Sequence, residues 1–176
     1  PTAAIDAMRR ALHSSPRFLP AQVAAGRLLI QADDWQGLAS LWEGEMQFTE
    51  DVEGLASVAF RLGYLWERRL SDLPDARRQA RDAYRRVLRV RPNHFPTLHA
   101  LLGIAYDAGD WAAAAQHLEA IVSSAPDPAT RCSYLCELAA VRETYLEDLP
   151  GACAAYRSAL ELDIESVDAL FGVLRT

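Results

Sequence analysis

The sequence has 176 residues, 51% of them hydrophobic, and a formal net charge of −6 at pH 7. This apolar content can form a substantial core, and because no run of about 18 uncharged apolar residues occurs, we expect no membrane insertion. The three cysteines, Cys132, Cys136 and Cys153, form neither an even set nor a C-x-x-C pair, which disfavours a disulfide framework and favours a reducing, cytoplasmic compartment.

The composition predicts an all-α fold, because the dominant residues, alanine, leucine, arginine and glutamate, are strong helix formers. The chain begins at Pro1 in what reads as the middle of a repeat. We therefore expect a segment of a longer protein, and a targeting signal in that protein would decide the compartment.

The expected elements form one array over residues 1–176. A partial repeat at 1–15 holds an isolated helix at about 3–14. Four helical hairpins follow, at 18–48, 52–91, 95–126 and 129–164, and a truncated helix closes the array at 166–176. The second and fourth hairpins are long, so we expect extra turns around their junctions, at 66–79 and 142–151.

An internal repeat supports this division, because the chain matches itself at an offset of 76 residues. Trp35 falls on Trp111, and the Asp-Leu-Pro triplet at 72–74 falls on the triplet at 148–150. Each unit of this size divides again into two hairpins, which gives the period expected for helix-turn-helix repeats.

The clearest hairpin is 95–126, with two apolar stripes at helical spacing. Gly109 suits a left-handed C-cap and Asp110 the following N-cap, so a turn is predicted between the two helices. A small-aromatic pattern recurs in the second helices at 80–92 and 152–163, written ARDAYRRVLRVRP and ACAAYRSALELD.

These features resemble the tetratricopeptide repeat over nearly the whole chain. The matching positions in hairpin 95–126 are Leu98, Leu101, Leu102, Ala105, Gly109, Asp110, Trp111, Ala114, Leu118 and Pro126. The resemblance implies a right-handed α-α superhelix whose first helices line a concave side. It also implies a non-catalytic scaffold that binds a protein or peptide partner.

The register of that family assigns inward-facing positions on the first helices. The candidate partner-binding residues among them are Arg27, Ile30, Arg61, His99, Tyr106 and Glu137. Trp66 would be a further contact residue if it is exposed, whereas Trp35 and Trp111 are expected to pack in the core.

Charge adds a second candidate surface. Residues 61–91 hold ten arginines against four acids, a net charge of +6, whereas residues 92–176 carry −8. The arginine stripe 77–89 shares one side of a helix, and its candidate contacts are Arg78, Arg81 and Arg85. It is interpreted either as a solvated face or as a docking patch for an acidic partner, including a second copy of the chain. A nucleic acid partner is not expected, because the chain is acidic and no aromatic residues interleave with the stripe.

No catalytic or phosphate-binding motif occurs, so we expect no enzyme, cofactor or metal. Cys132 and Cys136 lie one turn apart, but in the family register they are packing positions. Three hypotheses remain open: an adaptor with one binding groove, a self-assembling module that uses the arginine stripe, and a regulatory domain of a larger protein.

Overall fold

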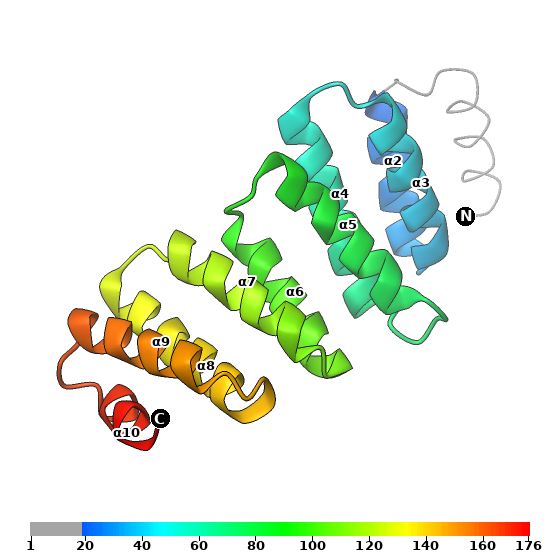
Figure 1. The fold of residues 1–176 in the computed structure, drawn as a ribbon. Coiled ribbons are helices and arrows are strands. Elements are labelled where there is room, and N and C mark those ends of the chain that lie inside the picture. The colour runs from blue at the N-terminus through cyan, green and yellow to red at the C-terminus, as the bar shows by residue number, and fades with distance from the viewer. Residues whose placement is uncertain (1–18) are drawn as a thin grey trace. The chain divides into compact units, whose positions relative to one another are not determined.

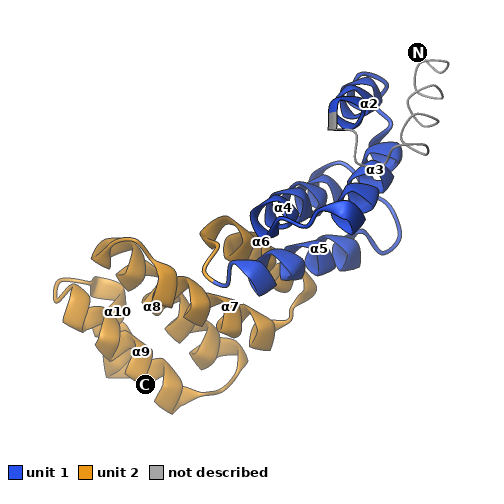
Figure 2. Cartoon of the chain, turned by 90° about the horizontal axis from the view of Figure 1, so that it is seen from above, with its two compact units in different colours: residues 1–92 blue, residues 93–176 orange. Residues whose placement is uncertain are grey.

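The computed structural model describes residues 19–176, and all of their regular secondary structure is helical (Figure 1). The chain divides into two compact units, unit 1 at residues 1–92 and unit 2 at residues 93–176 (Figure 2). The expected helix at 3–14 lies outside the described residues. No helix in the described part of the chain is both long and apolar enough to cross a membrane.

Residues 19–92 of unit 1 form two helical hairpins. Helices α2 (Leu19–Gln31) and α3 (Trp35–Phe48) form the first, and α4 (Val52–Arg68) and α5 (Ala76–Val90) form the second. Each helix packs against the next one along the chain. The second hairpin is long, as the sequence predicted: α4 has 17 residues, and a loop at residues 69–75 joins it to α5.

Unit 2 repeats the order of the helices described in unit 1 and ends with a further helix. Its hairpins are α6 (Phe95–Ala108) with α7 (Trp111–Ser124), and α8 (Pro128–Tyr145) with α9 (Leu149–Leu162). Helix α10 (Val167–Arg175) packs against both α8 and α9. The all-α prediction of four helical hairpins followed by a partial repeat is confirmed. The organisation of residues 1–176 as one array remains a prediction.

Three of the hairpin turns share one backbone geometry. In each, a residue with positive φ is followed by an aspartate that caps the second helix. The first residues are Asp33 (φ 53°), Gly109 (φ 65°) and Glu147 (φ 54°). A backbone N–H three residues further on donates a hydrogen bond to each aspartate side chain. The pairs are Gly37 N–H with Asp34 (2.8 Å), Ala113 N–H with Asp110 (3.1 Å) and Gly151 N–H with Asp148 (3.0 Å). The predicted roles of Gly109 and Asp110 are therefore confirmed, and the other two turns use the same cap with a non-glycine residue.

The cores lie between the paired helices. In unit 1 the fully buried side chains include Leu38, Tyr84 and Val87, and in unit 2 they include Leu118 and Ile121. Complete burial of a side chain of this size stabilises a fold by roughly 1.5 to 3 kcal/mol. The helical spacing of the apolar residues therefore accounts for which face of each helix packs inward.

The offset between equivalent residues changes where α4 is joined to α5 in unit 1 and α8 is joined to α9 in unit 2. The Asp-Leu-Pro triplet at 72–74 lies in the loop before α5, whereas its counterpart at 148–150 begins α9, where Asp148 is the N-cap. Proline is tolerated in the first turn of a helix because its missing N–H would have no partner there. The junction in unit 2 is four residues shorter, so that Tyr84 of α5 is equivalent to Tyr156 of α9.

Candidate functional site

Four of the six candidate residues on the first helices are exposed to solvent. Arg27 and Ile30 on α2, Arg61 on α4 and His99 on α6 are exposed. Tyr106 on α6 and Glu137 on α8 are partly buried, because they contact each other. The structure brings Ile30 together with Arg61, and Tyr106 together with Glu137.

Ile30 and Arg61 line an apolar groove in unit 1. It has a volume of about 360 Å³ and is formed by α2, α3 and α4 together with the residue after α4. Its lining residues are Ile30, Trp35, Leu38, Trp42, Phe60, Arg61, Tyr64, Leu65 and Arg69. We call this site the α2–α4 groove. Its volume is at the low end of the range for small-ligand sites, about 300 to 1,000 Å³.

The core of unit 1 supports the floor of this groove. Leu38 and Leu65 are buried, whereas Ile30 and Tyr64 remain 47% and 54% exposed. Trp35 packs against the same core, as the sequence predicted, but it also lines the groove. The floor is therefore held in place by packing, and the two exposed apolar side chains are available for contact.

Two arginine–tryptophan pairs flank the apolar lining. The Arg61 Cζ atom lies 5.0 Å from the centroid of the Trp42 ring, and the Arg69 Cζ atom lies 4.8 Å from that of Trp35. Both distances suit a cation–π interaction. Arg61 also forms an ion pair with Glu45 at 3.5 Å, whereas Arg69 forms no ion pair with any residue that the structure describes. The groove therefore combines apolar surface with positive charge.

At the equivalent positions in unit 2 the side chains contact one another or a neighbouring helix. The Tyr106 hydroxyl donates a hydrogen bond to Glu137 Oε1 at 2.6 Å. Burial, followed by this hydrogen bond, raises the pKa of Tyr106 well above its usual range. The ring of Tyr145 stacks on that of Trp111, with centroids 3.6 Å apart and planes within 8° of parallel.

His99 lies in a separate aromatic group of unit 2. Its ring stacks near that of Phe95, with centroids 6.5 Å apart, and Phe95 meets Tyr134 edge to face at 6.0 Å. His94 hydrogen-bonds Thr97 through Nδ1 at 2.7 Å, at the start of α6. These contacts account for both histidines through packing and helix-end hydrogen bonding.

The arginine stripe of α5 is mostly exposed. Arg78 forms an ion pair with Asp75 at 3.2 Å, and Arg85 forms none with the described residues. Arg81 is partly buried, and its Nε atom is shielded from solvent with no hydrogen-bond acceptor in the described part of the chain. Arg81 is therefore less available to a partner than Arg78 and Arg85.

A second hollow, of about 610 Å³, lies in unit 2 among α8, α9 and α10 and contains both Cys132 and Cys136. Burial raises the pKa of the Cys136 thiol, which favours the neutral form. The Cys136 sulfur lies 3.9 Å from Ser166 Oγ, and Cys132 is buried. Among residues 19–176, no three His, Cys, Asp or Glu side chains are grouped so that they could hold a metal ion.

Sequence reasoning missed seven of the groove's nine residues: Trp35, Leu38, Trp42, Phe60, Tyr64, Leu65 and Arg69. The internal repeat carried a signal for Arg69, because the offset of 76 places it opposite Tyr145. A cation in one unit and an aromatic ring at the equivalent position of the other show that the two units differ chemically at this place. Trp66, considered as a contact residue if exposed, instead packs against the core of unit 1.

Comparisons with known proteins identify the fold. No family model matches the sequence, and no curated protein matches it. Among solved structures, YrrB, described as a TPR protein with an unusual peptide-binding site, superimposes with a TM-score of 0.55 at 14% identity, over 95% of this chain and 80% of YrrB.

Two further structures agree with it. The C-terminal part of a TPR repeat-containing protein from Cytophaga hutchinsonii gives a TM-score of 0.56 at 19% identity, over 96% of this chain and 65% of that one. MamA gives 0.57 at 16% identity, over 92% of this chain and 87% of MamA. The resemblance drawn from the sequence is thus confirmed, and the chain has the fold of the tetratricopeptide-repeat proteins.

Proposed function

We propose that the chain is a non-catalytic scaffold for protein–protein interaction, and that the α2–α4 groove binds an extended segment of its partner. The observation that carries this proposal is the groove itself, an open apolar hollow on the outward side of two first helices. Its supported floor and its exposed rim residues, Ile30 and Tyr64, favour binding. The peptide-binding site described for YrrB supports the class of function and not any residue of this chain.

The physical argument rests on the exposed apolar surface. Covering such surface releases water and stabilises a complex by roughly 25 cal/mol per Å². Arginine and tryptophan, both present in this groove, are the residue types that most often dominate the energy of protein interfaces. A groove of about 360 Å³ holds one or two bulky side chains, which suits a short partner segment.

Selection from a random dodecapeptide library tests this proposal. We expect the wild-type chain to enrich peptides whose binding is confirmed by calorimetry with synthetic copies. Ile30→Asn and Tyr64→Asn should each weaken binding at least fivefold, because both side chains line the groove and are exposed enough to be changed without unfolding.

Val52→Asn is the matched control, because Val52 is 56% exposed in the same unit and does not line the groove. Circular dichroism of each variant reports whether the helices are intact. Enriched peptides that bind all three variants as tightly as the wild type would show that the groove is not the binding site.

A second candidate function is self-association through the arginine stripe 77–89. It is favoured by the exposure of Arg77, Arg78, Arg85 and Arg89 on α5 and by the net charge of −8 on residues 92–176. Light scattering at low and high salt tests it, using a variant with Arg77, Arg78 and Arg85 changed to Glu. A dimer that both salt and the variant dissociate would support self-association, and a salt-independent monomer would reject it.

A further inference from the structure

The two units provide an internal comparison at the α2–α4 groove. Helices α2, α3 and α4 begin at residues 19, 35 and 52, and α6, α7 and α8 begin 76 residues later in each case. The positions of Ile30, Arg61 and Arg69 are therefore equivalent to those of Tyr106, Glu137 and Tyr145.

In unit 2 the side chains at these three positions have partners within the unit. Tyr106 and Glu137 hydrogen-bond each other, and Tyr145 lies flat on Trp111. The aromatic surface of Trp111 and the carboxylate of Glu137 thus already have partners within the chain. The stacked ring of Tyr145 occupies the side of Trp111 that a partner side chain would otherwise contact.

In unit 1 the same positions leave the site open and cationic. Ile30, the equivalent of Tyr106, has no hydroxyl that could hydrogen-bond to α4. Arg61, the equivalent of Glu137, has a guanidinium in place of the carboxylate. Arg69 takes the place of the stacked Tyr145, so that a cation lies over Trp35. Where unit 2 has a glutamate bonded to a tyrosine, unit 1 has two arginines, of which Arg61 is paired with Glu45 at 3.5 Å.

We infer that the α2–α4 groove selects a partner segment in which a bulky apolar side chain is flanked by acidic side chains, while the equivalent site of unit 2 is closed by Tyr106 and Tyr145. This inference rests on the proposed function and adds the chemistry of the ligand. The charge complementarity comes from Arg61 and Arg69, and the apolar contact comes from Ile30, Phe60 and Tyr64.

Arg61 and Arg69, which lie over the Trp42 and Trp35 rings, can bind carboxylates. A guanidinium that lies over an indole ring keeps its N–H donors in its own plane, where a carboxylate can accept two of them. Such charge-assisted hydrogen bonds are about twice as strong as neutral ones. Arg69 has no ion pair with a described residue, and the pairing of Arg61 with Glu45 at 3.5 Å is partly exposed, so both can accept a new partner.

The spacing of the arginines predicts the spacing of the acids. Arg61 and Arg69 are eight residues apart along α4 and its C-cap, which is about 12 Å along the axis at about 1.5 Å per residue. An extended peptide covers that length in about four residues. The preferred segment therefore has acidic residues about four positions apart, with the apolar residue between them, and its acids belong to side chains and not to a chain terminus.

An array of capped nonapeptides tests the inference on the intact chain. Each peptide has a central Phe, Leu or Trp, with Asp, Asn or Arg two positions to either side. We expect the Asp peptides to bind at least tenfold more tightly than the isosteric Asn peptides, and the Arg peptides not to bind. Arg61→Gln and Arg69→Gln should each weaken the Asp peptides at least fivefold and leave the Asn peptides within twofold.

Two further variants sharpen this test. Arg91→Gln removes the same charge from unit 1 at an exposed residue that does not line the groove, and it should leave affinity within twofold of the wild type. The triple variant Ile30→Tyr, Arg61→Glu, Arg69→Tyr copies the side chains that close unit 2 and should abolish binding while keeping the helical circular dichroism spectrum.

The outcomes separate this inference from the proposed function. If the Asp and Asn peptides bind equally, the inferred acidic segment is wrong. The groove would still stand as a binding site provided Ile30→Asn and Tyr64→Asn weaken the peptides that do bind. If no peptide from either library binds the wild-type chain, both proposals fail.

Discussion

The ring of Tyr84 on α5 packs directly against the Cα of Gly63 on α4. A Cβ atom at position 63 would lie 2.6 Å from the Cδ1 and Cε1 atoms of Tyr84, closer than two carbon atoms can approach. Tyr84 is fully buried and cannot move aside without disturbing the core. Tyr156 meets Gly172 in the same way in unit 2, at 2.5 Å. The glycine is therefore required by the tyrosine and not by backbone conformation.

Gly63→Ala is accordingly expected to destabilise the chain by about 1 to 3 kcal/mol, the usual cost of overpacking a core. Gly44→Ala and Gly103→Ala are the matched controls, since an added Cβ there meets no atom within 4 Å. Both should be stabilising by about 0.5 to 1 kcal/mol, because alanine is the better helix former. Urea unfolding followed by circular dichroism measures all three, and a stabilising Gly63→Ala would contradict the packing described.

The stability of the chain should fall with pH above about 10, the ordinary pKa of tyrosine. The Tyr84 hydroxyl donates to Glu67 Oε2 at 2.7 Å, and burial, then this hydrogen bond, raises the pKa of Tyr84 far above its usual value. Above pH 10 the unfolded chain loses this proton while the folded chain keeps it, so each pH unit costs about 1.4 kcal/mol per such tyrosine.

Tyr84→Phe tests that sign. The variant should lose about 1 kcal/mol at pH 7 through the missing hydrogen bond, and its free energy of unfolding should fall less steeply than that of the wild type between pH 10 and 11. Urea unfolding at pH 9, 10 and 11 measures the slopes, with Tyr64→Phe, a change at an exposed ring, as the control. Equal slopes for Tyr84→Phe and the wild type would mean that Tyr84 titrates alike in both states.

At the positive-φ positions of the hairpin turns, a change to glycine should stabilise the chain and a change from glycine to alanine should destabilise it. Glu147 adopts φ 54°, which glycine adopts without strain and other residues do not. Glu147→Gly should therefore stabilise the chain by about 0.5 to 1 kcal/mol, and Gly109→Ala should destabilise it by about 1 kcal/mol. Thermal unfolding of both variants decides the matter, and a loss of stability in Glu147→Gly would contradict the assigned backbone geometry.

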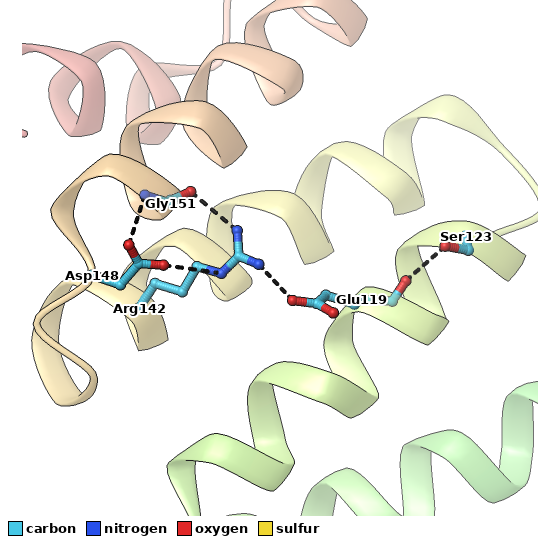
Figure 3. A network of polar contacts seen from close by, with 5 residues as sticks. All are labelled: Glu119, Ser123, Arg142, Asp148 and Gly151. Atoms are coloured by element: carbon cyan, nitrogen blue, oxygen red, sulfur yellow. Dashed lines mark hydrogen bonds and ion pairs between the residues drawn. The ribbon is translucent and has the colours of Figure 1, made fainter.

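Arg142 joins three helices of unit 2 (Figure 3). Its guanidinium donates to Glu119 Oε1 on α7 at 2.5 Å and to the carbonyl oxygen of Gly151 on α9 at 3.2 Å, and it lies 3.8 Å from Asp148. The Arg142 side chain is 23% exposed, so these contacts are only partly screened by water.

Arg142→Met keeps much of the packing and removes the polar contacts, and we expect a loss of about 1 to 2 kcal/mol. Arg157→Met on α9 is the control, since Arg157 is exposed and forms no ion pair with a described residue. It should stay within about 0.5 kcal/mol of the wild type. Identical urea midpoints for the two variants would show that the Arg142 network contributes nothing to stability.

Much of the fold followed from local patterns. Apolar residues at helical spacing predicted which faces pack inward, and the aspartates and Gly109 predicted where helices begin and stop, because capping depends on neighbours within one turn. The change of offset between α5 and α9 did not follow, since the same Asp-Leu-Pro triplet lies in a loop in one unit and starts a helix in the other.

The sequence by itself determined the all-α class and the helical hairpins, because both depend on periodicity and capping along single helices, and the family register placed Ile30, Arg61, Tyr106 and Glu137 on the first helices. Only the tertiary structure decided which of those positions form a groove. Whether a site is open depends on side chains from three helices meeting in space: Arg69 stays over Trp35 without an ion-pair partner in the described chain, whereas Tyr145 covers Trp111.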